Sequence, residues 1–309
     1  MTLGDPRGIG PEVVAASFRV FRERRPRPYL VVVGPSGTGA HGDADEFIGI
    51  GHWAGGVAAA AGALAGRAIE CATRLAMEGR VDAVVTAPID KAALHAAGYS
   101  YPGHTEMLAT LAGAPDVAMM MTAEDAGRGH PLRVVLATTH VALRAVPDLV
   151  DAPLLERQVE ITAAALANGW GIERPRIALC AFNPHASDGG LFGDEERTVY
   201  APALNALRGR GFDVHGPVPA DTVFVRALRG EFDAVVAPYH DVGMAAFKTA
   251  SFGRGVNVTL GLPFVRTSPD HGTALDIAGR GVADPSSMIE ALVLADRLAA
   301  RRAAPGART

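Results

Sequence analysis

The sequence has little cysteine and no excess of positive charge. Cys71 and Cys180 are the two cysteines among 309 residues, and both lie in apolar stretches, so the chain has no disulfide framework and fits a reducing compartment. Its 29 Lys and Arg residues against 33 Asp and Glu leave a formal charge of −4. An electrostatic nucleic-acid binder normally carries a clear basic excess, so we expect no nucleic-acid partner.

Long hydrophobic runs and an N-terminal targeting pattern are missing as well. Nowhere do about 18 apolar residues follow one another without interruption, the length that a membrane-spanning helix needs. The first residues carry neither the basic nor the apolar stretch of a signal peptide. We therefore expect a cytoplasmic protein with no membrane partner. At 49% hydrophobic and 20% charged residues the chain has a globular composition, and its length allows about two domains.

Short β-branched runs alternate with amphipathic stretches along the chain, which is typical of βαβ units and a largely parallel sheet. The expected strands are Tyr29–Val33, Val81–Thr86, Arg133–Thr138, Ile177–Ala181, Ala234–Ala237 and Val256–Leu260. The expected helices are Leu64–Met77, Leu154–Ala167, Ala201–Leu207 and Pro285–Ala300, with left-handed glycines Gly79 and Gly169 after two of them. The Gly- and Ala-rich stretch Gly34–Gly56 is expected to be a loop. The fold class is therefore α/β.

Three histidines share one context, because each comes shortly after an apolar run. They are His140, His185 and His240, which are separated by 45 and 55 residues in the sequence. Each separation is long enough for a crossover connection from one strand to the next. The carboxyl ends of strands carry the ligand crevice in open α/β sheets. Three imidazoles delivered there would make an open metal site, and its cation would polarise an alcohol or carbonyl oxygen. The alternative is that they are ordinary loop histidines at strand ends.

The acids beside these histidines and a glycine-rich segment near the N-terminus have two interpretations each. Asp188 and Asp241 are either partners of the imidazole N–H groups or solvated loop acids. The segment Gly4–Glu12 contains Gly-x-Gly without a third glycine at the dinucleotide-binding spacing, so a standard Rossmann site is not expected there. It is either a tight turn into a helix near Pro11 or backbone that lies close to a ligand.

Two further segments carry groups suited to anions. Gly103-His104-Thr105-Glu106 precedes a helical stretch, where a helix N-terminus would favour phosphate, or where Thr105 would simply be the N-cap. A cationic cluster surrounds the strand near residue 257, and Arg and Lys are suited to carboxylate or phosphate. Its members are Lys248, Arg254, Asn257 and Arg266, and a solvated basic face is the competing interpretation.

The chain resembles the 4-hydroxythreonine-4-phosphate dehydrogenase family of vitamin B6 biosynthesis in segments that follow one another from residue 4 to about residue 295. The run Phe252–Asp284 is the longest and most specific of them. The others are Gly4–Glu12, Val84–Lys91, Gly103–Glu106, Ala137–His140, Asn183–Gly190, Pro217–Thr222 and Tyr239–Gly243.

The resemblance implies a fold similar to isocitrate and isopropylmalate dehydrogenases, with two α/β lobes, a largely parallel sheet and an active-site cleft between the lobes. We expect residues 1–309 to form one such two-lobed unit, with one lobe at 1–110 plus 235–309 and the other at about 111–234. The resemblance also implies a homodimer whose active site is shared between protomers.

Residue roles follow from the matched segments. His140, His185 and His240 match the ligands of a divalent metal (Zn, Mg or Co). His104, Thr105, Lys248, Asn257 and Arg266 match substrate-binding positions. His271, Gly272, Thr273, Ala274 and Asp276 are similar to the loop with which isopropylmalate dehydrogenases hold the adenosine of NAD.

The implied reaction is the oxidation of 4-phosphooxy-L-threonine by NAD or NADP, followed by decarboxylation to 3-amino-2-oxopropyl phosphate. The chain departs from the family at Val242 and Ala245, where Gln and Pro are common. Relatives that oxidise D-threonate or D-erythronate 4-phosphate, or a terephthalate cis-dihydrodiol, therefore stay open. The stretch Asn183–Gly193 favours the dihydrodiol, whereas Gly103–Glu106, Asn257 and Arg266 favour a phosphorylated substrate. The second set carries more weight, because those positions would touch the ligand. A catalytically silent paralogue that senses a metabolite is a further alternative.

Overall fold

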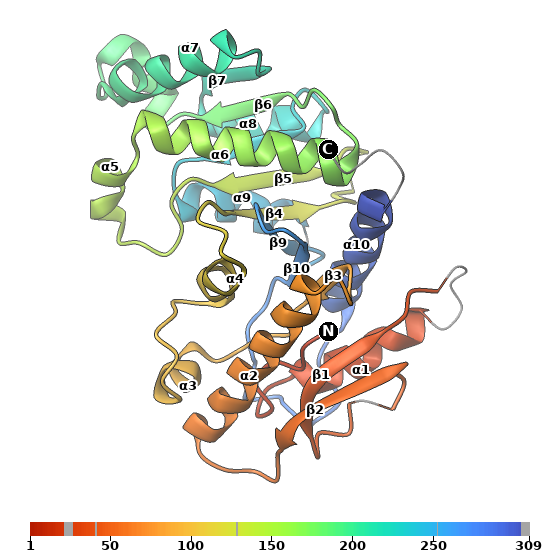
Figure 1. The fold of residues 1–309 in the computed structure, drawn as a ribbon. Coiled ribbons are helices and arrows are strands. Elements are labelled where there is room, and N and C mark those ends of the chain that lie inside the picture. The colour runs from red at the N-terminus through yellow and green to blue at the C-terminus, as the bar shows by residue number, and fades with distance from the viewer. Residues whose placement is uncertain (22–26, 41, 128, 252, 304–309) are drawn as a thin grey trace. The chain divides into compact units, whose positions relative to one another are not determined.

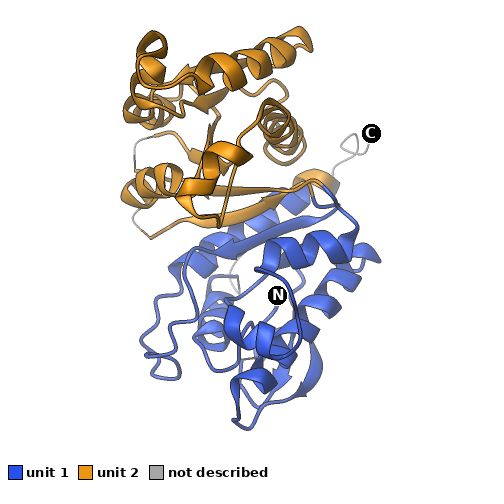
Figure 2. Cartoon of the chain, turned by 90° about the vertical axis from the view of Figure 1, so that its left-hand side faces the viewer, with its two compact units in different colours: residues 1–115, 262–300 blue, residues 116–261, 301–309 orange. Residues whose placement is uncertain are grey.

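Figure 1 shows a computed structural model that describes residues 1–21, 27–40, 42–127, 129–251 and 253–303. The chain divides into two compact units, residues 1–115 with 262–300 and residues 116–261 with 301–309 (Figure 2). From the sequence we expected the chain to return to the first lobe at residue 235. The return lies at Leu262 instead, because the strands and the helix between residues 234 and 260 belong to the second unit.

The first unit contains two small parallel strand pairs with helices around them. β1 pairs with β2, and β10 pairs with β3. Thr2 forms bridges to both Val33 and Thr86, so the N-terminal residues lie between the two pairs. The elements are α1 (Gly10–Phe21), β1 (Val31–Ser36), β2 (Glu46–His52), α2 (Ala58–Met77), β3 (Ala83–Val85), α3 (Lys91–Ala96), α4 (His104–Ala112), β10 (Val265–Pro269) and α10 (Ser286–Ala303).

The expectation of a loop over Gly34–Gly56 was wrong in part. Residues 46–52 form β2, which pairs in parallel with β1 from Val31 opposite Glu46 onward. Phe47, Ile48 and Ile50 supply strand-favouring side chains that the surrounding glycines hide from a composition count. Residues 37–42 also have the Gly-x-Gly-x-x-Gly spacing after β1, but β2 and not a helix comes next, so the context of a dinucleotide fingerprint is missing.

The second unit is built on six strands in the order β9-β4-β5-β8-β6-β7. The pairs β5–β8, β8–β6 and β6–β7 are parallel, whereas β4 runs antiparallel to β5 and β9. The elements are β4 (Ala118–Ala123), β5 (Leu132–Leu136), α5 (Val146–Leu149), α6 (Ala152–Ala165), β6 (Ile177–Cys180), α7 (Ala201–Gly209), β7 (Val214–Val218), α8 (Ala220–Leu228), β8 (Ala234–Ala237), α9 (His240–Ser251) and β9 (Val256–Leu260). The predicted α/β class with a largely parallel sheet is confirmed.

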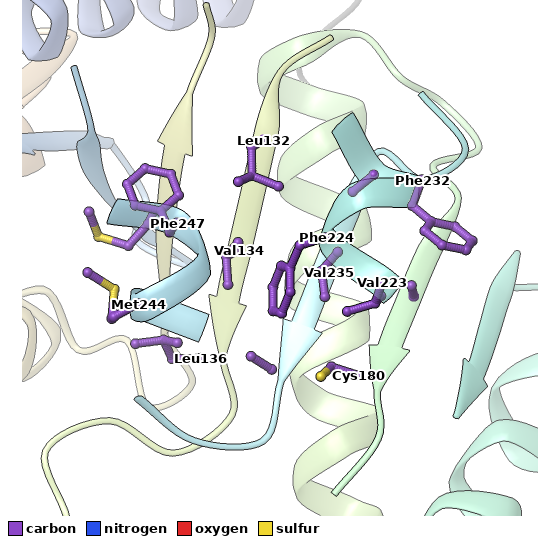
Figure 3. Packing of buried hydrophobic residues seen from close by; sticks show 14 of the residues in the cluster. Leu132, Val134, Leu136, Cys180, Val223, Phe224, Phe232, Val235, Met244 and Phe247 are labelled. Atoms are coloured by element: carbon purple, nitrogen blue, oxygen red, sulfur yellow. The ribbon is translucent and has the colours of Figure 1, made fainter. Parts of the chain in front are cut away.

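Apolar side chains from the central strands of the second unit pack under α8 and α9 (Figure 3). Val134 of β5 and Val235 of β8 are fully buried, and Phe224 and Phe247 cover them from the two helices. Burying such side chains stabilises the fold by about 1.5–3 kcal/mol each. This core fixes the strands whose ends carry the candidate histidines. In the part of the chain that is described, no helix has the length and apolar character that crossing a membrane requires.

Of the two glycines predicted to take the left-handed conformation after a helix, one does so. Gly79 takes the left-handed conformation expected after α2, with φ +68°. The same expectation for Gly169 was wrong, because the chain continues in a wide helical turn over Leu166–Trp170 and Gly171 is the residue with positive φ. The predicted strands Ala234–Ala237 and Val256–Leu260 are confirmed residue for residue.

Candidate active site

The three candidate metal ligands follow neighbouring strands of the second unit. β5, β8 and β6 lie side by side and run parallel, so their carboxyl ends meet at one edge of the sheet. His140 comes after β5, His240 starts α9 directly after β8, and His185 follows β6. We call this the histidine edge.

Two members of the histidine edge are close together. The ring centroids of His140 and His240 are 5.8 Å apart at an angle of 42°. His240 Nδ1 and Asp241 Oδ1 are 2.7 Å apart, and the Asp241 side chain is largely exposed. A carboxylate on one ring nitrogen orients the imidazole and leaves the other nitrogen to act as a ligand, which is how metal-bound histidines are commonly supported. Of the two acids singled out from the sequence, Asp241 thus contacts an imidazole, whereas Asp188 makes no described contact with one.

His185 lies on an unusual segment, Pro184–Gly190. Five consecutive residues, His185 to Gly189, have φ between +43° and +71°, and four of them are not glycine. Each non-glycine residue in this region costs roughly 1–2 kcal/mol, so other contacts must hold the segment. Within the described ranges, no three His, Cys, Asp or Glu side chains are close enough to hold a metal ion. The described residues therefore form a pair of histidines, and His185 lies on an exposed loop that follows the neighbouring strand β6.

Glu196 anchors the base of that loop and was missed in the sequence. Its Oε1 accepts hydrogen bonds from the backbone N–H groups of Phe182 (2.9 Å) and Asn183 (2.7 Å), and its Oε2 accepts one from Asn183 Nδ2 (2.9 Å). Burial alone would raise the pKa of Glu196, but hydrogen bonds from Asn183 and Ser187 outweigh burial and hold the pKa below its ordinary value. The ionised carboxylate fixes the two residues that precede Pro184.

In the first unit, Arg266 is a buried cation. The residue is 2% exposed, and its Nη2 donates to Thr86 Oγ1 over 2.7 Å. Burial lowers the pKa of Arg266 to about 10, and the nearby Glu106 opposes that shift. The guanidinium therefore stays charged at neutral pH.

His104 lies at the N-terminus of α4 beside this cation. Burial, followed by the charges of Arg266 and Lys91, lowers the pKa of His104 well below its ordinary value, so the imidazole is neutral. Its Nε2 atom is buried and makes no hydrogen bond within the described part of the chain. The alternative role of Thr105 as N-cap was wrong, because α4 starts at His104 and Gly103 is the cap residue, without a side-chain hydrogen bond. We call His104, Thr105 and Arg266 the cationic group, after the guanidinium at its centre.

The other two predicted substrate residues belong to the second unit. Lys248 is an exposed residue in the last turn of α9. Asn257 lies on β9, and its Oδ1 atom is buried without a hydrogen-bond donor in the described ranges. Buried polar atoms nearly always have a partner, so this oxygen is suited to receive one from a ligand.

The predicted cofactor loop, His271–Asp276, is held by the N-terminal segment of the first unit. Ile9 N–H donates to the Thr273 carbonyl over 2.9 Å, and a Cβ atom on Gly8 would lie 2.7 Å from that same oxygen. Glycine at position 8 is thus required by the approach of another part of the chain. His271 Nδ1 is 3.0 Å from the Gly272 carbonyl, while His271 Nε2 is buried with no hydrogen bond among the described residues.

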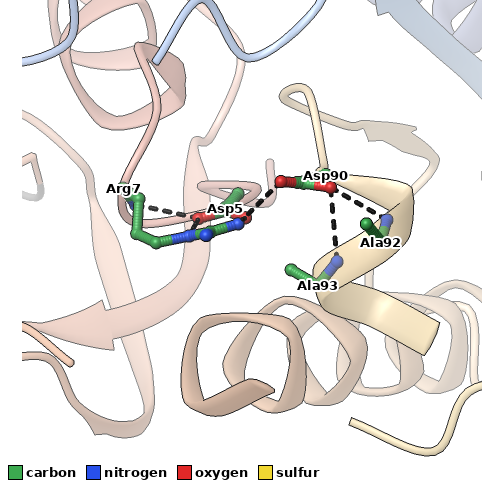
Figure 4. A network of polar contacts seen from close by, with 5 residues as sticks. All are labelled: Asp5, Arg7, Asp90, Ala92 and Ala93. Atoms are coloured by element: carbon green, nitrogen blue, oxygen red, sulfur yellow. Dashed lines mark hydrogen bonds and ion pairs between the residues drawn. The ribbon is translucent and has the colours of Figure 1, made fainter. Parts of the chain in front are cut away.

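A polar network links this N-terminal segment to α3 (Figure 4). Arg7 Nη2 contacts Asp5 Oδ2 over 2.7 Å and Asp90 Oδ2 over 2.9 Å, and Asp90 Oδ1 accepts from the Ala92 and Ala93 N–H groups at the start of α3. Hydrogen bonding and charge from Asp5, opposed by burial, raise the pKa of Arg7 above its ordinary value. The network fixes the residue after Asp90, which is Lys91.

The sequence matches a family model and several curated relatives. Residues 37–295 match the family model described as pyridoxal phosphate biosynthetic protein PdxA. A 4-hydroxythreonine-4-phosphate dehydrogenase of Methylorubrum populi is 44% identical over 98% of this chain and 95% of its own. A D-threonate 4-phosphate dehydrogenase of Cupriavidus necator is 42% identical over 98% of this chain and 97% of its own.

Solved structures give the same result. A 4-hydroxythreonine-4-phosphate dehydrogenase from Klebsiella pneumoniae is 41% identical and superposes with a TM-score of 0.83 over 96% of this chain and 98% of its own. A β-decarboxylating dehydrogenase from Thermococcus kodakarensis is 18% identical with a TM-score of 0.56, covering 96% of this chain and 82% of that one, and so shares the fold. The chain is therefore a member of the PdxA family of dehydrogenases.

Proposed function

We propose that the protein oxidises 4-phosphooxy-L-threonine with NAD or NADP and a divalent metal, and that decarboxylation then yields 3-amino-2-oxopropyl phosphate. The observation that carries the proposal is the histidine edge, three imidazoles that follow adjacent parallel strands. Nitrogen ligands of this kind suit Zn²⁺ or Co²⁺. A relative named for this activity, 44% identical, supports the choice of substrate.

The reaction balances as an oxidation followed by loss of CO₂. The alcohol carbon gives up a hydride, the hydroxyl gives up its proton, and the resulting β-keto acid loses its carboxylate as CO₂ before the carbon takes a proton. A nicotinamide supplies the hydride acceptor, and a divalent cation supplies positive charge beside the substrate oxygen. We assign the cation to His140, His185 and His240, and the nicotinamide's adenosine portion to His271–Asp276.

The residues of the cationic group would bind the substrate. Arg266 holds a permanent charge in a buried setting, where attraction to a phosphate or carboxylate is stronger than at the surface. Neutral His104 would donate or accept a hydrogen bond without adding charge. Lys248 and Asn257 would contribute an ammonium and an amide oxygen. Fixing the anionic ends in this way reduces the entropy lost when the reacting carbon is positioned.

A second candidate substrate is D-threonate 4-phosphate. A relative that acts on it is 42% identical over nearly the whole chain, close to the value for the threonine-phosphate enzyme. Val242 and Ala245, the departures from the family, lie on α9 between His240 and Lys248, where a change would alter what is bound. NADH formation with the two substrates side by side, in the presence of Co²⁺ or Zn²⁺, decides between them.

Turnover of 4-phosphooxy-L-threonine alone supports the proposal. Turnover of D-threonate 4-phosphate alone replaces it with oxidation of that sugar-acid phosphate. Activity on neither, with turnover of a terephthalate cis-dihydrodiol, would move the protein to that class. Silence on all three, together with no bound metal and no thermal shift with NAD, would indicate a sensor.

We also propose that the protein acts as a homodimer, as the family resemblance implies. Leu191 and Phe192, on the loop after His185, are 72% and 46% exposed, which is unusual for such apolar residues and favours burial against a second copy. Light scattering after size exclusion tests this, and a mass of one chain would contradict it.

A further inference from the structure

Lysine is almost absent from this chain. Of the 29 Lys and Arg residues only two are lysines, Lys91 and Lys248, and the other 27 are arginines. Arginine therefore serves nearly everywhere that a positive charge is used. The two lysines are of interest in such a background, because a compact ammonium and a planar guanidinium are not interchangeable in binding an anion. Lys248 already belongs to the predicted substrate set, and Lys91 has no role so far.

Lys91 is placed at the cationic group of the first unit. A Cβ atom added to Gly103, the cap residue of α4, would lie 3.6 Å from Lys91 Cε and 4.0 Å from Lys91 Nζ. The charge of Lys91 is also one of the two that depress the pKa of His104, the other being that of Arg266. Two cations thus act on one imidazole at the start of a nine-residue helix whose first N–H groups have no side-chain cap.

The side chain of Lys91 is not used in holding the fold together. It is exposed, and no hydrogen bond or ion pair of its ammonium is found in the described ranges, although Glu106 Oε2 would lie 3.5 Å from the same Cβ atom on Gly103. Its backbone, in contrast, is fixed, because Asp90 caps α3 and is itself held by Arg7, which is paired with buried Asp5 (Figure 4). Holding the base of a side chain while leaving its charge unused is the arrangement expected of a ligand-binding residue.

We propose that Lys91 binds the phosphate group of the substrate at the N-terminus of α4, together with Arg266, and so determines specificity for phosphorylated substrates. The inference rests on the proposed function, which it deepens by adding a residue to the substrate site. Helix N–H groups, a guanidinium and an ammonium together match the charge of a phosphate dianion better than that of a carboxylate. The buried, unbonded Nε2 of His104 is a further polar atom at this place that a ligand could satisfy.

The test uses the full chain with Lys91→Gln and Lys91→Arg. We expect Lys91→Gln to raise the KM for the phosphorylated substrate about tenfold or more, with a smaller change in kcat, since a charged contact to phosphate is lost. Calorimetric titration with inorganic phosphate should show a similar loss of affinity. Lys91→Arg keeps the charge and should recover part of the affinity only, because the guanidinium is larger and differently shaped.

Arg74→Gln is the matched control, since it removes an exposed cation of the same unit whose nearest carboxylate, that of Glu78, is 4.0 Å away. It should change neither KM nor phosphate affinity. Unaltered phosphate affinity and KM in folded Lys91→Gln would overturn the inference, as would a wild-type protein that does not bind phosphate. If wild type binds phosphate and Lys91→Gln does not, while neither proposed substrate is turned over, the proposed substrate fails and the role of Lys91 stands. Thermal denaturation of each variant identifies folding defects, and Lys91→Arg supplies the answer if Lys91→Gln is unfolded.

Discussion

In the first unit Arg266 is 2% exposed, whereas in the second unit the His240 side chain is 38% exposed. The same contrast extends to their neighbours. His104 and Arg266 have pKa values shifted chiefly by burial, while His185 lies on an exposed loop. The cationic group is therefore formed by the folded chain itself. The histidine edge has its members on segments that follow the strands, and a bound cation would complete it.

This difference reflects the cost of each arrangement. Moving a charged group from water into a protein interior is expensive unless it is paired, so a buried arginine must be held by the surrounding fold. Exposed imidazoles cost little in desolvation, and the energy for ordering their loops can come from metal binding. We expect mutations in the cationic group to affect substrate binding, and those in the histidine edge to affect metal binding.

The largest expected effect is that of His240→Ala. Removing one of the paired imidazoles should lower turnover about 1,000-fold, because the cation's contribution of several kcal/mol to the transition state is lost. Stability should change little, since the side chain is partly exposed. Steady-state NADH formation and Co²⁺ titration measure the two properties. His215→Ala is the control, because His215 also pairs with an aspartate, Asp213, over 2.7 Å but lies on β7 away from the histidine edge. Equal losses in both variants would contradict the assignment.

Arg266→Lys tests the cationic group and should reduce kcat/KM about 100-fold, mainly through KM. Lysine keeps the charge but cannot donate two parallel hydrogen bonds to an oxyanion. Arg133→Lys is the comparison, since Arg133 is 6% exposed and contacts Glu124 and the ring of Trp170 in the second unit. It should lower stability and leave KM unchanged. If Arg133→Lys raised KM as much as Arg266→Lys, the rise would be a general effect of replacing a buried arginine. The assignment of Arg266 to substrate binding would then be wrong.

Part of this contrast can be predicted from the sequence. Apolar runs with β-branched residues mark β8 and β9 to the residue, and because parallel strands share an edge, the spacing of the histidines that follow the strands is enough to group them. β4 was missed because three of its six residues are methionines, which carry little strand preference. β2 was missed because glycines surround it.

The burial of individual side chains could not be predicted in the same way. Arg266 and Lys91 are 175 residues apart, and only the packing of α3, α4 and β10 brings both charges to His104. The anchoring of the His185 loop by Glu196 could not be predicted either. A carboxylate that accepts hydrogen bonds from backbone N–H groups can do so from any sequence, so no residue pattern indicates it. The rarity of lysine is a sequence signal for Lys91, but it gains its meaning only from the position of that side chain beside α4.

Glu196→Gln should destabilise the second unit by about 2 kcal/mol at pH 7, because the amide cannot accept from Asn183 Nδ2 as the carboxylate does. The pKa of Glu196 is depressed in the folded state, so its stabilising contribution is present above its ordinary pKa of 4.5 and disappears as the pH falls through the lower folded value. The difference between wild type and variant should therefore shrink below about pH 4.5. Urea denaturation at several pH values measures it, and a difference that grew in acid would contradict the assignment.

The smallest expected effect concerns Asp241, which supports His240 from the exposed side. Asp241→Asn keeps the shape of the side chain and a hydrogen bond to Nδ1, but removes the negative charge that makes the imidazole a stronger ligand. We expect the affinity for Co²⁺ to fall about tenfold. The KM for the phosphorylated substrate, which depends on Arg266, should stay unchanged. Asp213→Asn, which alters the equivalent pair at His215, should leave Co²⁺ affinity as in wild type. A rise in KM without a loss of metal affinity would place Asp241 with the substrate residues instead, and metal binding at the histidine edge would no longer be separate from anion binding at the cationic group.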